Sequence, residues 1–126
     1  MFDHASVGVE DVRAAAKFYG PVLETLGAKE LLMADWGVGY GREALAFFAM
    51  RAYDGRAATA GNGAHVAFRA DSSAAVDAFH AAALARGGRC AGAPGRREAL
   101  GEQTYAAFVY DPFGNKLEAI FTGFAR

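Results

Sequence analysis

The sequence predicts an α+β fold in which two pseudo-symmetric βαβββ modules form a curved, cavity-lining mixed sheet with helices outside. Short segments alternate apolar and polar residues, and two longer ones repeat apolar residues at three-and-four spacing, the periods of strands and helices. The order of these segments restarts at residue 65. The 126 residues make a single domain, with module 1 at about 1–53, a linker at about 54–63 and module 2 at about 64–126.

In the first module we expect a strand at 1–9, a helix at 12–26, and strands at 29–35, 36–41 and 44–51. Glu10 and Asp11 precede the helix, where a carboxylate can accept hydrogen bonds from unpaired backbone N–H groups. Pro21 lies inside the helical segment, so we expect it to kink or divide the helix. Gly27 is expected to end the helix, because glycine adopts the left-handed conformation found there.

The second module repeats this order. We expect a strand at 65–69, a helix at 74–86 capped by Asp71-Ser72-Ser73, a short strand at 88–93, and strands at 103–110 and 115–122. The segment 92–102 contains Pro94, Gly95 and Gly101 and is predicted to be a loop. It is either a lid over a site or a solvated connection.

A constant register relates the two modules. A shift of 61 residues places His4 on His65, and a shift of 70 places Phe48 on Glu118. Apolar residues of the first strand of each module are expected to face the helices, so alternation puts both histidines on the opposite, concave face. Glu118 points to the concave face of the last strand for the same reason.

Two imidazoles and one carboxylate are a common ligand set for a divalent metal that keeps open coordination positions. A metal can bind a substrate or water at such a position and polarise a carbonyl, stabilise an enolate or activate oxygen. The residues alone leave open a plainer alternative. In that case His4 and His65 are hydrogen-bonded structural residues, and Glu118 is solvated or ion-paired.

Four segments resemble the vicinal oxygen chelate superfamily. They are Asp3-His4-Ala5-Ser6-Val7-Gly8-Val9-Glu10-Asp11-Val12, Lys17-Phe18-Tyr19-Gly20-Pro21-Val22-Leu23, His65-Val66-Ala67-Phe68 and Asp111-Pro112-Phe113-Gly114-Asn115-Lys116-Leu117-Glu118. The last, with the pattern D-P-x-G-N-x-x-E, is the most specific. This superfamily contains glyoxalase I, bleomycin-resistance proteins, extradiol dioxygenases, fosfomycin-resistance proteins and methylmalonyl-CoA epimerase. The resemblance implies paired βαβββ modules, usually assembled as a dimer.

The resemblance places the metal ligands at His4, His65 and Glu118, with one divalent ion (Fe, Mn, Ni, Co or Zn) as cofactor and Glu118 as the candidate catalytic residue. The fourth ligand position of the family falls on Phe48. Glyoxalase I and the epimerase use four protein ligands, so Phe48 argues against both activities. The fosfomycin-resistance transferases and the extradiol dioxygenases share the three-ligand pattern.

Three functions remain open at this point. The first is a divalent-metal-dependent enzyme (lyase, isomerase, transferase or oxygenase) whose small, oxygen-rich substrate chelates the metal. The second is a metal-free protein that binds a small molecule or drug, as bleomycin-resistance proteins do, and a third, weaker one is a regulatory or structural dimer. Candidate substrate contacts are Arg69, Tyr105, Phe48 and Trp36. The alternative for Arg69 is an ion pair at the rim of the sheet, and for Phe48 and Trp36 it is the core or a dimer interface. Either Tyr105 or Tyr110 is expected to face the cavity, and alternation alone does not decide which.

Composition and charge limit the classes of partner that we expect this protein to bind. The net charge of −1 predicts no basic face for nucleic acid or an anionic membrane, and no segment approaches the roughly 18 apolar residues of a membrane span. The single cysteine, Cys90, and the lack of a visible signal peptide favour a cytoplasmic location. Composition therefore leaves a small-molecule substrate as the expected partner, and the resemblance implies a homodimer.

Overall fold

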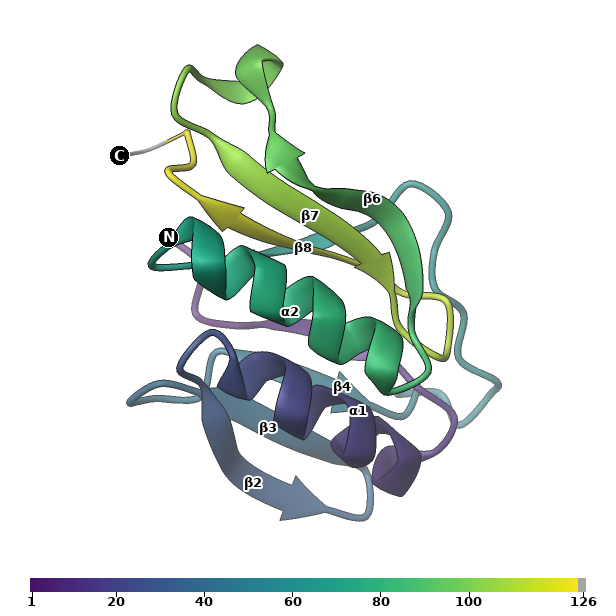
Figure 1. Ribbon diagram of the computed structural model, residues 1–126. Helices are drawn as coiled ribbons and strands as arrows, with labels where there is room; N and C mark the ends of the chain where they lie inside the picture. Colours follow the sequence, from purple (N-terminus) through teal and green to yellow (C-terminus); the bar gives the residue numbers. More distant parts are fainter. Residues whose placement is uncertain (125–126) are drawn as a thin grey trace.

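The computed structural model describes residues 1–124 and consists of two βαβββ modules (Figure 1). Module 1 comprises β1 (Ala5–Gly8), α1 (Val12–Glu24), β2 (Lys29–Ala34), β3 (Gly37–Gly41) and β4 (Phe47–Met50). Module 2 comprises β5 (Val66–Arg69), α2 (Ser73–Ala85), β6 (Arg89–Arg96), a short 3-10 helix (Glu98–Leu100), β7 (Tyr105–Tyr110) and β8 (Lys116–Phe121). The predicted fold class and the predicted repeat are confirmed.

Each module forms its own four-stranded mixed sheet, in the order β1-β4-β3-β2 and β5-β8-β7-β6. β1 pairs in parallel with β4, and β5 pairs in parallel with β8. Ser6 lies opposite Phe48 in the first sheet and Ala67 lies opposite Glu118 in the second, so Phe48 and Glu118 occupy equivalent positions. β1 and β5 are edge strands, and within residues 1–124 no backbone hydrogen-bond ladder joins the two sheets.

Both helices pack side by side against the sheets (Figure 1). Buried apolar residues of both modules form one core cluster. In it the Phe68 ring lies 5.0 Å from the Phe47 ring and 6.4 Å from the Phe79 ring, so β4, β5 and α2 meet. Strand residues that alternate with core residues lie on the opposite side of each sheet, which we name the outer face. Neither helix of residues 1–124 has the length and apolar character that crossing a membrane requires.

The turn from Asp111 to Asn115 ties module 2 to module 1. The buried Asp111 carboxylate accepts hydrogen bonds from two backbone N–H groups of the turn at 2.8 Å and from the Tyr19 hydroxyl of α1. Asn115 Nδ2 donates to the Gly8 carbonyl at 2.9 Å. The most specific residues of the sequence motif thus hold the turn that leads into β8, and so fix the place of Glu118.

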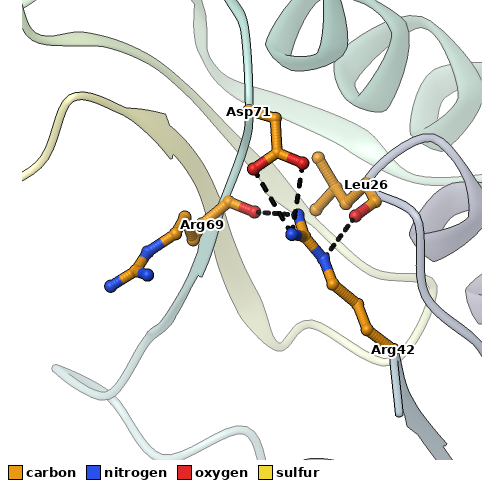
Figure 2. A network of polar contacts seen from close by, with 4 residues as sticks. All are labelled: Leu26, Arg42, Arg69 and Asp71. Atoms are coloured by element: carbon orange, nitrogen blue, oxygen red, sulfur yellow. Dashed lines mark hydrogen bonds and ion pairs between the residues drawn. The ribbon is translucent and has the colours of Figure 1, made fainter.

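Arg42 is a second connection between the modules (Figure 2). Its Nε donates to the Leu26 carbonyl at 3.1 Å, its guanidinium pairs with Asp71 at 3.1 Å, and it donates to the Arg69 carbonyl at 3.5 Å. One side chain after β3 therefore binds the segment that follows α1, the end of β5 and Asp71 before α2. Figure 2 also shows that the Arg69 guanidinium points away from this network.

Both helix starts agree with the sequence prediction. Asp11 and Ser72 are the N-caps, and their side chains accept hydrogen bonds from the Ala14 and Ala75 N–H groups at 3.0 Å. Gly27 follows α1 with a φ of 79°, the left-handed conformation expected at a helix end.

Two local predictions need correction. α1 runs unbroken from Val12 to Glu24, so Pro21, in its last turn, does not divide the helix. β6 extends to Arg96, beyond the predicted strand end at residue 93. Irregular pairing with β7 around Gly92 and Gly95 absorbs the glycines, and an edge strand tolerates Pro94.

Candidate metal centre

The outer face of the second sheet carries a histidine–carboxylate pair. His65 Nε2 lies 3.2 Å from Glu118 Oε1. His65 directly precedes β5, and Glu118 lies opposite Ala67 on β8, so parallel strand pairing brings the two side chains together. Glu118 is 5% exposed, whereas the His65 side chain is 45% exposed. The pair combines a buried carboxylate with an imidazole that solvent reaches.

Glu118 Oε2 is buried and has no hydrogen-bond partner among residues 1–124. A buried carboxylate oxygen without a partner loses hydration free energy, on the order of a few kcal/mol. The nearest cation along β8 is Lys116, two residues away, but its ammonium lies over the Phe108 ring, 5.2 Å from the centroid. A cation bound to Oε2 would supply the missing partner, so this donor set fits a metal ion.

His4 lies on the outer face of the first sheet, just before β1. Its Nδ1 lies 2.6 Å from Asp3 Oδ1, which leaves Nε2 as the free ring nitrogen. A carboxylate on one ring nitrogen is typical of metal-ligating histidines, because it orients the imidazole and raises its basicity. The His4 ring packs edge-on against Phe48, with centroids 5.3 Å apart.

The structure brings together two of the three predicted metal ligands. His65 and Glu118 are in contact, but no group of three His, Cys, Asp or Glu side chains within residues 1–124 is placed to hold a metal. His4 and His65 border one groove of about 820 Å³, yet they belong to different sheets. Within one chain, His4 therefore stands apart from the pair.

Phe48 presents an aromatic surface at the position of module 1 that is equivalent to Glu118 in module 2. A Cβ at Gly39 would lie 2.8 Å from Phe48 Cε1, so glycine at this position of β3 leaves room for the ring. The half-exposed Trp36 ring lies 6.0 Å from the Phe48 ring. His4, Phe48 and Trp36 form an aromatic cluster on the first sheet, which includes two of the predicted substrate contacts.

The other two predicted substrate contacts lie on opposite faces. Arg69 is exposed and borders the groove between the histidines. Tyr105 faces the helices, and its hydroxyl donates to Asp77 of α2 at 2.6 Å, a hydrogen bond that raises the pKa of Tyr105. This corrects the expectation for Tyr105, because alternation along β7 puts Tyr110 on the outer face instead.

Sequence reasoning placed none of three residues around Glu118 in the site, although one of them, Arg97, lies in the segment 92–102, the predicted lid or solvated connection. Phe108 lies directly opposite Glu118 on β7. Lys116 and Arg97 both lie over the Phe108 ring, with Nζ at 5.2 Å and Cζ at 5.8 Å from its centroid. The alternation of β8 is a signal that could have found Lys116. No local pattern shows that Arg97 folds back over β7, because its position depends on the irregular pairing of β6.

Residues 1–119 match the Glyoxalase/Bleomycin resistance protein/Dioxygenase superfamily. The chain belongs to this superfamily. A glyoxalase/bleomycin resistance protein from Albidiferax ferrireducens T118 is 38% identical, with a TM-score of 0.88 over 96% of this chain and 98% of its own. The resemblance carried by the D-P-x-G-N-x-x-E segment is thus confirmed at the level of the superfamily.

Two more distant solved structures share the fold of this superfamily. A glyoxalase-related enzyme from Fulvimarina pelagi is 19% identical, with a TM-score of 0.73 over 97% of this chain and 88% of its own. A family enzyme from Burkholderia phytofirmans PsJN is 21% identical, with a TM-score of 0.70 over 92% of this chain and 94% of its own. No curated protein is significantly similar to the chain.

Proposed function

We propose that this protein is a divalent-metal-dependent enzyme in which His65 and Glu118 of one chain and His4 of a second copy hold the metal. The observation that carries the proposal is the buried, unpartnered Oε2 of Glu118 beside the His65 imidazole. Imidazole nitrogen with carboxylate oxygen suits Fe, Mn, Ni, Co or Zn, so we propose one such ion as the cofactor. The relatives from Fulvimarina pelagi and Burkholderia phytofirmans are both described as enzymes.

A homodimer would bring His4 to the histidine–carboxylate pair. β1 and β5 are edge strands whose outward backbone groups are available for a neighbour. The outer face of the first sheet is apolar, since Leu45 and Phe48 lie over Gly39, and Trp36 is 47% exposed. If this face covered the second sheet of another copy, its apolar surface would be removed from water. His4 would then lie next to the other copy's second sheet. Two-fold symmetry would create the same site twice.

A bound ion would act as a Lewis acid on adjacent oxygens of a small substrate. The residues of the chain would do the rest. Asp3 orients His4, the strand pairing of β8 holds Glu118 rigidly, and Phe48 leaves one family ligand position without a donor. We propose that the substrate takes that position, which permits lyase, isomerase, transferase or oxygenase chemistry and disfavours glyoxalase I proper.

The aromatic cluster of His4, Phe48 and Trp36 favours a second candidate function, metal-free binding of a small molecule or drug. In that function a ligand would stack on the exposed Trp36 ring and on Phe48. Its affinity would then not change when metal is added or removed. This difference separates the two candidates.

Elemental analysis of tag-free protein, purified without chelators and then titrated with Fe(II), Mn(II) and Zn(II), tests the proposed enzyme. We expect about one equivalent of metal per chain, lost in His65→Ala and in Glu118→Gln, because each removes one donor. His80→Ala is the matched control, since it removes an imidazole that lies 3.2 Å from Cys90 Sγ, outside the site. Protein that takes up no metal, or keeps it in both site variants, would contradict the proposal and favour metal-free binding.

A further inference from the structure

The outer face of the second sheet holds cations that no acid neutralises. Glu118 is the single acidic residue on the outer face of β5, β7 and β8, and it contacts His65. Among residues 1–124, no carboxylate lies within ion-pair distance of Arg69, Arg97 or Lys116. Within residues 1–124 Arg42 is the one Lys or Arg that forms an ion pair, so an unpaired cation alone does not mark this face. What marks it is that Lys116 and Arg97 gather over one ring, that of Phe108, beside a single carboxylate.

Lys116 borders a hollow of about 520 Å³, together with His65, Tyr110 and the loop 60–64. Gly61 and Gly63, which have φ angles of 72° and 97°, contribute backbone without side chains to one wall of the hollow. Lys116 precedes Glu118 by two residues on β8, a separation of about 7 Å along a strand. A small organic molecule is long enough to reach from the Lys116 ammonium to the His65–Glu118 pair.

Arg97 is held over the same face by backbone contacts. Its Nη2 donates to the Ala93 carbonyl at 2.6 Å, and its Nη1 donates to the Arg96 carbonyl at 3.3 Å. A Cβ at Gly95 would lie 3.1 Å from Nη1, so the glycine leaves room for the guanidinium. Guanidinium has five N–H donors, and these two bonds leave the others for a ligand.

We propose that the outer face of the second sheet binds a small organic oxyanion, a carboxylate or a phosphate, through Lys116 and Arg97 beside the His65–Glu118 pair. Ammonium and guanidinium groups bind oxyanions with charge-assisted hydrogen bonds, which are stronger than neutral ones. Both cations lie within 6 Å of the Phe108 ring, whose apolar surface displaces water and strengthens the attraction. An anionic group held there directs the rest of the molecule toward His65 and Glu118. The role of this site in the reaction rests on the proposed function, whereas the anion site itself does not.

Titration of metal-free protein with benzoate, inorganic phosphate and neutral benzamide at constant ionic strength tests this inference. We expect saturable binding of at least one anion and roughly tenfold weaker binding of that anion in Lys116→Gln and in Arg97→Gln. Lys116→Arg keeps the charge and is expected to keep most of the affinity. Lys29→Gln is the matched control, because it removes the same charge from the exposed start of β2. Tighter binding of benzoate or of phosphate identifies the anionic group.

The inference is overturned if neither anion binds up to tens of millimolar, if benzamide binds as tightly as benzoate, or if Lys116→Gln and Lys29→Gln have equal effects. Metal uptake by the same preparations separates this result from the proposed function. Protein that binds metal but neither anion leaves the proposed function intact and removes the anion site. Protein that binds an anion but no metal keeps the anion site and contradicts the proposed function.

Discussion

Phe48 occupies in module 1 the position that Glu118 occupies in module 2. Each lies on the last strand of its module, opposite the second residue of a parallel first strand. Each also contacts the histidine that precedes that first strand, His4 at 5.3 Å between ring centroids and His65 at 3.2 Å between nitrogen and oxygen. One backbone arrangement thus supports an aromatic surface in one module and a histidine–carboxylate pair in the other.

Phe48→Glu is predicted to tighten metal binding roughly tenfold, because it adds a carboxylate where the register places the partner of Glu118. Calorimetric titration with Mn(II) or Zn(II) measures the change. Met50→Glu is the matched control, since it adds the same group two residues further along the outer face of β4. Equal effects of the two substitutions would show that added negative charge, and not a fourth ligand, is responsible.

Tyr19→Phe is predicted to lower stability and Tyr40→Phe to leave it unchanged or raise it, although both residues are fully buried. The Tyr19 hydroxyl donates to the Asp111 carboxylate, so its removal is expected to cost about 1–3 kcal/mol of unfolding free energy. The Tyr40 hydroxyl is buried without a partner among residues 1–124, so its removal should be neutral or stabilise by up to about 1 kcal/mol. Urea unfolding of the three proteins measures both values. A loss of stability in Tyr40→Phe as large as in Tyr19→Phe would contradict this account.

Stability is predicted to fall at alkaline pH. Burial and the nearby Asp111 carboxylate hold the pKa of Tyr19 well above its usual value, and burial with Glu30 raises the pKa of Tyr40. The unfolded chain releases these protons near pH 10 while the folded protein keeps them. The stabilisation is therefore complete below about pH 10 and is lost above it, by about 1.4 kcal/mol per pH unit for each tyrosine.

Urea unfolding at several pH values between about 9 and 11.5 measures this slope. In Tyr19→Phe the fall of unfolding free energy with pH should be smaller by about 1.4 kcal/mol per pH unit, because phenylalanine has no proton to release. Equal slopes in Tyr19→Phe and in the unchanged protein would show that Tyr19 does not contribute.

The repeat and the helix starts could be predicted because their causes are local. The caps at Asp11 and Ser72 depend on side chains and backbone groups three residues apart. Alternation along a strand likewise assigns Phe48 and Glu118 to a face without knowledge of the rest of the chain.

Features that depend on contacts between distant segments could not be predicted. The bond between Tyr19 and Asp111 joins α1 to a turn 92 residues later, and such contacts decide how the two sheets are placed. Because that placement separates His4 from the His65–Glu118 pair, the sequence indicated the three donors but not their division between two sheets. The position of Arg97 depends in the same way on its contact with Phe108.

The central claim is that one metal site combines His4 of one chain with His65 and Glu118 of another. Mixing His4→Ala chains with His65→Ala chains tests it most directly. Each variant alone should bind no metal at this site. After the two are unfolded together and refolded in equal amounts, half of the dimers are mixed and each mixed dimer contains one intact site. Elemental analysis should then find metal in about a quarter of the sites. Refolded protein without substitutions should regain all of its metal. If that control succeeds and the mixture recovers no metal, or if His4→Ala alone keeps its metal, the site is not shared between chains and the account is wrong.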